Sequence, residues 1–245
     1  MKERKNRLIG KIVLFGAVYT IGVLMAFLLY LFRALGIIRI LHWERFPRRQ
    51  GNLIVVSNHP SLVEPILILA LFFRDYLVHP FKFSPWSTPD KINYYDKWYW
   101  FWLRPRAIPI DRSSVREELK AFFQMKKIVG SRGILVLFPE GGRTFKGKEF
   151  FHSEKKRKKL RLFKQGVGWL ILRTNALVLP IWVDGTEEFL PNLPNKLYHT
   201  FPRFWKKITI KIGEPLRFQK SEVNSREGIT QKLITTLLNL ADEEK

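Results

Sequence analysis

The chain has 245 residues, enough for one α/β domain with a full core and a membrane segment. It contains no cysteine, which excludes a disulfide framework, a thiolate zinc site and a cysteine nucleophile. A net charge of +22, from 43 Lys and Arg against 21 Asp and Glu, requires an anionic partner. The candidates are nucleic acid, an anionic membrane surface and a phosphorylated substrate.

The N-terminus favours the membrane. Residues 12–32 carry no charge and match the ~20 residues that cross a bilayer core. No small-residue cleavage site follows, so an uncleaved anchor is favoured over a signal peptide, with a buried core helix as the alternative. Five Lys or Arg lie shortly before the segment and five shortly after it, so charge does not choose an orientation. A segment that enters one leaflet and returns also remains open, with Gly16 and Gly22 permitting a bend.

Residues 35–46 are amphipathic and contain Trp43 and Arg45, a composition typical of an interfacial helix. The chain therefore divides into an N-terminal membrane anchor with its interfacial helix, residues 1–45, and one folded domain, residues 46–245.

From Asn52 onward, short apolar runs alternate with helical patterns. This alternation predicts an α/β fold with a mixed, largely parallel sheet flanked by helices. The predicted strands are residues 53–56, 77–83, 107–110, 134–138, 178–183 and 208–212. The predicted helices are residues 66–73, 113–129, 165–173 and 226–241.

Two further segments have an unusual composition. Residues 94–103 are dense in Trp and Tyr, which suits either the headgroup level of a membrane or a buried amphipathic helix. Residues 155–161, K-K-R-K-K-L-R, are interpreted as a solvated loop that touches anionic lipid headgroups. No nucleic-acid-binding motif accompanies the basic run, so we expect no nucleic-acid partner.

The most informative stretch is S-N-H-P-S-L-V-E-P, residues 57–65, between a predicted strand and a predicted helix. Such connections carry the chemistry of α/β folds. Across a bend, the carboxylate of Glu64 can turn back onto the imidazole of His59. A histidine oriented in this way is a general base for the proton of an alcohol. The alternative is an Asn-His loop followed by a helix-capping Glu.

Three other segments are candidates for anion binding. In P-E-G-G-R-T, residues 139–144, two glycines allow close backbone approach, and Arg143 offers a planar fork to phosphate oxygens. A P-loop overlapping this segment is rejected because Glu149 stands where the pattern needs a hydroxyl. Arg112, before a predicted helix, either faces a phosphate or is merely exposed. Residues 178–183, V-L-P-I-W-V, form an apolar strand interrupted by Pro180.

In this order, the four blocks resemble the signature of the glycerolipid acyltransferase superfamily, especially the 1-acyl-sn-glycerol-3-phosphate acyltransferases. That family carries N-H-x4-D, a block ending in Arg, F-P-E-G-T-R-S and a strand with a central proline. The resemblance covers roughly residues 52–216 and includes L-F-K-Q-G at residues 162–166 and I-K-I-G-E-P-L at residues 210–216.

The resemblance implies acyl transfer from a CoA or acyl-carrier-protein thioester to lysophosphatidate, with His59 as general base and Glu64 as its orienting carboxylate. It implies no cofactor beyond this acyl donor, and the expected location is the bacterial inner membrane with the catalytic domain on the cytoplasmic face. The remaining histidines, His42, His79, His152 and His199, have no ligand spacing, so we predict no metal. The residues that match substrate-binding positions are Asn58, Arg112, Glu140, Gly141, Gly142, Arg143, Thr144 and Pro180.

Two departures from the family pattern affect the expected identity of the acceptor more than the expected type of reaction. Glu64 replaces the usual Asp, and Gly142 replaces the usual Thr. Alternatives therefore remain: another lysolipid or glycolipid acceptor, or an inactive, membrane-docked relative that acts as a binding module. A route through an acyl group on Ser61 is also considered, although no G-x-S-x-G motif is present.

Overall fold

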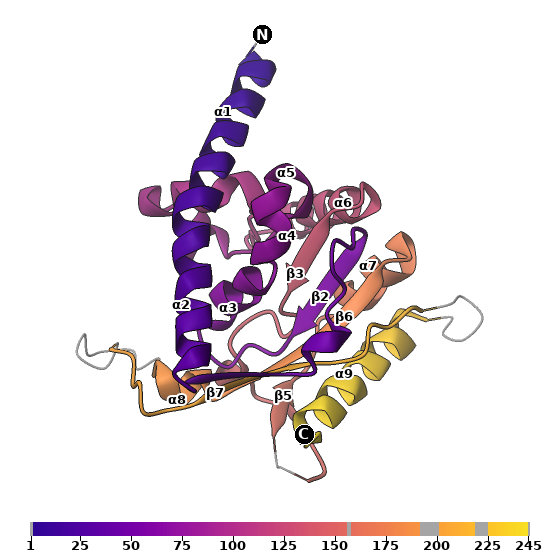
Figure 1. Cartoon of the computed structure of the whole chain (residues 1–245). Helices are drawn as coiled ribbons and strands as arrows, with labels where there is room; N and C mark the ends of the chain where they lie inside the picture. Colours follow the sequence, from indigo (N-terminus) through magenta and orange to yellow (C-terminus); the bar gives the residue numbers. More distant parts are fainter. Residues whose placement is uncertain (1, 156–157, 192–200, 219–224, 245) are drawn as a thin grey trace.

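A five-stranded sheet lies at the centre of the protein (Figure 1). The structure is a computed structural model that describes residues 2–155, 158–191, 201–218 and 225–244. The strands follow the order β1-β7-β6-β2-β3, and only the β6–β7 pair is antiparallel. The predicted mixed, largely parallel sheet is therefore confirmed. The strands are β1 Ile38–Leu41, β2 Leu53–Ser57, β3 Ile134–Leu137, β6 Leu177–Asp184 and β7 Ile208–Ile212.

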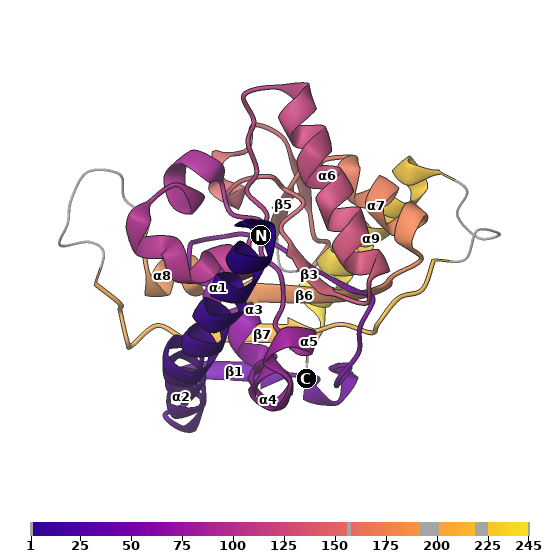
Figure 2. The ribbon, with the colours of Figure 1, turned by 90° about the horizontal axis from the view of Figure 1, so that it is seen from above.

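Helices cover both faces of this sheet (Figure 2). Successive side chains of a strand point to opposite faces, so Leu53 and Val55 pack towards one helical layer and Ile54 and Val56 towards the other. The first layer contains α3 Glu64–Leu71, α4 Phe73–Val78 and the N-terminal helix. The second contains α6 Val115–Gly130, α7 Gly166–Thr174 and α9 Arg226–Asp242. Shorter elements are α5 Pro80–Phe83, α8 Thr186–Phe189, β4 Phe150–His152 and β5 Lys159–Arg161.

The N-terminal helix runs without reversal from α1 Lys2–Ala17, through a π-helical segment η1 Val18–Gly22, to α2 Val23–Ala34 (Figure 1). Within the described residues, Leu8–Ala34 is the helix long and apolar enough to cross a membrane, by length and composition. One side of it packs on the domain, where Ala26 and Leu29 are buried. The opposite side exposes a row of large apolar side chains that includes Ile12 and Phe27.

The expected interfacial helix over residues 35–46 is wrong. Ile38–Leu41 forms β1, which pairs in parallel with β7, and a short 3-10 turn, η2 Trp43–Arg45, follows. The run I-R-I-L alternates apolar and polar positions, and in four residues this period of two is hard to distinguish from a helical stripe. The central sheet thus already includes residues that we assigned to the anchor region.

Two other predicted strands differ from the structure. Residues 77–83 contain the end of α4 and, after His79, the whole of α5. Pro80 stands in the first turn of α5, where its fixed φ and missing N–H suit a helix start. Residues 107–110 are extended, but Ala107 and Ile110 pair only through single bridges to Ser87 and Asp90.

The aromatic segment is exposed or half-buried, and the expected solvated loop over residues 155–161 is wrong in part, because Lys159–Arg161 forms β5 and Leu160 is fully buried. Residues 94–103 fall in η3 Lys91–Tyr95 and η4 Trp98–Arg106, and η4 buries none of its residues, which excludes the buried amphipathic helix. Lys156 and Arg157 of the basic run lie outside the described residues. Beside them, Lys158 pairs with Asp184.

Two glycines of α7 allow a matched test of the contact between α7 and α9. A Cβ on Gly168 would lie 2.2 Å from the Arg226 carbonyl oxygen, whereas one on Gly166 would meet nothing within 4 Å. We expect Gly168→Ala to destabilise the protein by about 1–3 kcal/mol through overpacking. Gly166→Ala should be neutral or stabilise by up to about 1 kcal/mol. Thermal unfolding in detergent measures both, and equal melting temperatures for the two variants would contradict the packing.

Candidate active site

The candidate site lies where three neighbouring strands end. Strands β2, β3 and β6 are mutually parallel, so their carboxyl ends meet at one edge of the sheet. Residues 58–64 follow β2, the segment P-E-G-G-R-T follows β3, and Gly185 and Thr186 follow β6. Open α/β sheets place their ligands at this edge. The fold therefore brings together the first and third sequence blocks and the end of the fourth.

His59 and Glu64 form the expected pair. The His59 Nδ1 atom lies 3.2 Å from Glu64 Oε2, and the imidazole stacks on the Phe138 ring with centroids 4.5 Å apart. An ionised carboxylate only accepts hydrogen bonds, so a neutral His59 ring carries its proton on Nδ1. The Nε2 lone pair has no partner in the described part of the chain. The ring is thus held from one side and presents a base on the other.

The carboxylate of Glu64 is fully buried, and both of its oxygens have partners. Oε2 contacts His59, and two donors contact Oε1. The Ser61 N–H donates to Oε1 at 2.8 Å, and the Thr186 hydroxyl donates to the same oxygen. The Ser61 hydroxyl itself is buried and accepts the Val63 N–H. This arrangement makes Ser61 part of the turn, and it favours direct attack by an acceptor over an acyl-serine route.

A second buried carboxylate, Glu140, ties the segments of the site to one another. Its Oε1 accepts the His59 N–H at 2.8 Å and the Thr144 hydroxyl at 2.9 Å, and its Oε2 accepts the Arg161 N–H at 3.0 Å. Burial raises the pKa of Glu140, and these three donors oppose that effect. Glu140 is 1% exposed, so its carboxylate faces the interior of the protein.

Three other residues predicted to bind substrate also point inward. The Asn58 amide pairs with both backbone groups of Val183, at 2.7 and 2.8 Å, and so fastens the end of β2 to β6. The Thr144 N–H donates to the His59 carbonyl oxygen at 2.8 Å. Pro180 is buried in β6, opposite Val56 of β2, and it packs on Gly213 just after the end of β7. A proline is tolerated there because the ladder with β7 needs no backbone N–H at this position.

Basic side chains surround the glycine loop. A Cβ on Gly141, where φ is +65°, would lie 2.8 Å from the Lys164 Cε atom, and one on Gly142 would lie 3.0 Å from Arg161 Nη1. Arg143 lies over the Phe145 ring in the same loop. Sequence reasoning missed Arg161 and Lys164 as site residues, although L-F-K-Q-G was a signal for Lys164.

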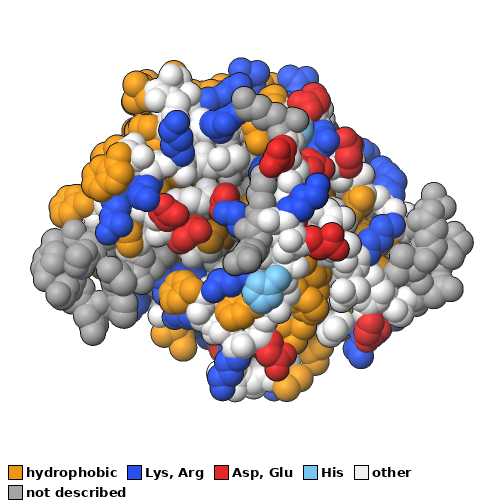
Figure 3. Space-filling view, turned by 90° about the horizontal axis from the view of Figure 1, so that it is seen from below, with side chains coloured by type: hydrophobic (Ala, Val, Ile, Leu, Met, Phe, Trp, Pro, Cys, Tyr) orange, Lys and Arg blue, Asp and Glu red, His pale blue; other side chains and the backbone are white. Residues whose placement is uncertain are grey.

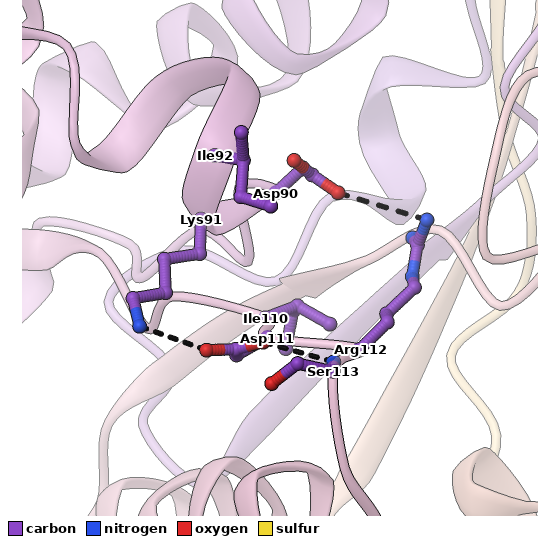
Figure 4. A pocket seen from close by; sticks show the side chains of 7 residues that line it. All are labelled: Asp90, Lys91, Ile92, Ile110, Asp111, Arg112 and Ser113. Atoms are coloured by element: carbon purple, nitrogen blue, oxygen red, sulfur yellow. Dashed lines mark hydrogen bonds and ion pairs between the residues drawn. The ribbon is translucent and has the colours of Figure 1, made fainter.

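Arg112 links the second block to this loop. Its Nη2 donates to the Gly141 carbonyl oxygen at 2.6 Å, and its Nη1 lies 3.7 Å from Asp90. A pocket of 270 Å³ lies beside it (Figure 4), lined by Asp90, Lys91, Ile92, Ile110, Asp111, Arg112 and Ser113. Its charges largely compensate one another, because Lys91 donates to Asp111 at 2.8 Å and thereby holds the pKa of Asp111 well below its usual range. At the glycine loop, Lys164 lies 3.7 Å from Glu118, whereas the guanidinium groups of Arg143 and Arg161 have no carboxylate partner among the described residues.

A histidine oriented by a buried carboxylate thus lies beside a basic glycine loop at the carboxyl edge of the sheet. This is the arrangement that general-base chemistry on an anionic substrate requires. Residues 38–184, more than half of the chain, match the family model described as Acyltransferase. The chain belongs to the acyltransferase family, which confirms the predicted resemblance.

A solved structure shows the same fold over nearly the whole chain. It is the crystal structure of the 1-acyl-sn-glycerophosphate (LPA) acyltransferase, PlsC, from Thermotoga maritima. The match has a TM-score of 0.55 and 17% sequence identity and covers 98% of this chain and 97% of that one.

The buried network can be tested by an isosteric change. In Glu140→Gln, an amide NH2 would face one of the N–H or O–H groups that now donate to the carboxylate. We expect a loss of about 1–3 kcal/mol in the free energy of unfolding, because a buried donor is left unpaired. Thermal unfolding of the purified protein measures it. Glu149→Gln, at an exposed carboxylate further along the chain, is the control and should leave stability unchanged.

Proposed function

We propose that the protein is a membrane-bound acyltransferase that uses an acyl-CoA or acyl-carrier-protein thioester as donor. The acceptor is the free hydroxyl of a lysophospholipid, with 1-acyl-sn-glycerol-3-phosphate as the first candidate and phosphatidic acid as its product. The observation that carries the proposal is the His59–Glu64 pair, whose free Nε2 faces away from the carboxylate beside the basic loop.

The reaction that this geometry supports is direct transfer. Nε2 of His59 removes the proton from the acceptor hydroxyl while its oxygen attacks the thioester carbonyl. The tetrahedral intermediate then expels the thiolate, and the protonated His59 returns the proton to the sulfur. Glu64 stabilises the imidazolium that forms between these steps. The backbone N–H groups of Gly142 and Arg143 have no acceptor in the described residues, and we assign them to the developing oxyanion.

The acceptor phosphate is assigned to the basic loop. Arg143, Arg161 and Lys164 project around Gly141 and Gly142, and a guanidinium binds two phosphate oxygens at once. Arg112 acts here by holding the Gly141 carbonyl oxygen, and Glu140 by holding the loop against His59. Asn58, Thr144 and Pro180 are likewise assigned to the support of the site instead of contact with substrate.

Membrane association is assigned to the exposed side of the N-terminal helix. Ile12 is 63% exposed and Phe27 60%, and both carry large apolar groups that a bilayer would cover. The neighbouring η4 exposes Trp98 and Tyr99, which suit the headgroup level. On the face seen from below (Figure 3), Lys and Arg side chains are spread among carboxylates and hydrophobic groups. The side chains coloured on this face form no continuous basic patch of the kind that a nucleic acid would need.

A different acceptor is the second candidate, and Gly142 is the observation that favours it. The family's threonine hydroxyl is absent there, and the Arg161 guanidinium occupies the adjoining space. Another lysolipid or a glycolipid would keep the same chemistry at His59. The inactive binding module is less well supported, because Glu64 keeps its contact with His59 despite its greater length.

Thiol release from palmitoyl-CoA and palmitoyl-carrier protein tests the reaction and the acceptor together. With lysophosphatidate present, we expect His59→Ala to lower turnover about 10²- to 10⁴-fold, the range for loss of a general base. His152→Ala, at an exposed histidine of β4, is the control and should keep wild-type turnover. Turnover with monoacylglycerol but not with lysophosphatidate would disprove the assignment of lysophosphatidate as the acceptor. Acceptor-dependent turnover that survives in His59→Ala would disprove the role of the base.

Membrane binding is tested by co-sedimentation with anionic phospholipid vesicles. We expect Ile12→Glu combined with Phe27→Glu to release most of the protein into the supernatant, because two carboxylates would have to enter the apolar layer. Val115→Glu, at a side chain of α6 that is 75% exposed, is the matched control and should still sediment. Equal sedimentation of the double variant and the control would show that another surface binds the membrane.

A further inference from the structure

A threonine that belongs to none of the four sequence blocks contacts the buried carboxylate of the site. Thr186 is fully buried, and its hydroxyl donates to Glu64 Oε1 although 122 positions separate the two residues. The other oxygen of the carboxylate, Oε2, faces His59 Nδ1 at 3.2 Å. Thr186, Glu64 and His59 therefore form a continuous chain of hydrogen bonds from the end of β6 to the catalytic base.

The fold places Thr186 there by two local devices. The Asn58 amide fastens the end of β2 to Val183, which fixes the register of the two strand ends. Gly185 then turns the chain sharply with φ +81°, and a Cβ at this position would lie 2.1 Å from the Lys207 carbonyl oxygen. Only glycine fits this close approach in the left-handed region. The next side chain, that of Thr186, consequently enters the space beside Glu64.

The hydroxyl of Thr186 is not needed by its own helix. Thr186 begins α8, a helix of four residues, and no side chain caps that helix. An ionised Glu64 only accepts hydrogen bonds, so the Thr186 hydroxyl must be the donor. This bond leads directly into the site and contributes nothing to the local backbone of α8.

We propose that Thr186 is a positioning residue for acyl transfer, which acts by fixing the Glu64 carboxylate so that Oε2 faces His59. The inference rests on the function proposed above. Glu64 is one methylene longer than the aspartate of the family pattern and has an additional torsion to restrain. The Ser61 N–H alone holds Oε1 at one point, and the second donor from Thr186 fixes the plane of the carboxylate.

The test compares steady-state kinetics of Thr186→Val and Thr186→Ser. Valine keeps the volume but removes the donor, so we expect kcat to fall about 10- to 100-fold, as for a lost bond to a charged group. KM for donor and acceptor should stay within about twofold, because Thr186 touches neither. Serine should restore most of kcat. Thr230→Val removes a buried hydroxyl that donates to the Arg226 carbonyl oxygen of its own helix, α9, and should leave kcat unchanged.

A double-mutant cycle with Glu64→Gln separates positioning from a general structural effect. If Thr186 acts through the carboxylate, Thr186→Val costs almost nothing further once Glu64 is Gln. Losses that multiply, or a kcat of Thr186→Val within twofold of wild type, would overturn the proposal. If Thr186→Val does not fold, Thr186→Ala replaces it in the same cycle.

A second measurement does not depend on turnover and so separates this inference from the proposed function. In protein with ¹⁵N-labelled histidine, the Nδ1–H proton of His59, assigned by its absence in His59→Ala, should resonate at low field because it bonds to a carboxylate. We expect this resonance to move or broaden in Thr186→Val and to persist in Thr186→Ser and Thr230→Val. An unchanged resonance in Thr186→Val would overturn the positioning role. A wild type that shows the resonance but turns over no acceptor would overturn the proposed function alone.

Discussion

The buried carboxylate of Glu140 is the constraint on which the site depends. It accepts hydrogen bonds from the backbone of His59 and Arg161 and from the hydroxyl of Thr144, so it joins the segments that follow β2 and β3 to β5. A carboxylate this deeply buried is tolerated only because these donors compensate for its lost hydration. Together with the bond from the Thr144 N–H to the His59 carbonyl oxygen, it fixes the basic loop relative to His59.

A second buried carboxylate, Glu64, has a different task because its surroundings differ. Two donors fix Oε1, and Oε2 is left for the imidazole of His59. Glu140 supplies the geometry of the loop and Glu64 the orientation of the His59 imidazole, and neither carboxylate faces solvent. Within the short segment P-E-G-G-R, Glu140 points inward, whereas the Arg143 guanidinium lies over the Phe145 ring.

The N-terminal helix is integrated with the domain it accompanies. Its buried side packs on α3 and α4, and the Tyr19 hydroxyl donates to the Leu77 carbonyl oxygen at 2.8 Å. The helix and the catalytic sheet therefore share one hydrophobic core, in contrast to an anchor joined by a flexible linker. A lipid surface that covers the exposed side of the helix would hold the domain, and with it the site, at a defined orientation.

The sequence by itself determined the features that are encoded locally. Apolar runs predicted β2, β3, β6 and β7, and the position of His59 and Glu64 across a strand-to-helix bend predicted the contact between their side chains. Tertiary structure decided what depends on neighbours distant in the chain. Burial turned Glu140 inward, β7 drew residues 38–41 into the sheet as β1, and the register of β6 brought Thr186 to the site. The physical reason is that strand pairing and burial depend on partners that can lie more than a hundred positions away in the chain. A local sequence pattern carries no information about such partners.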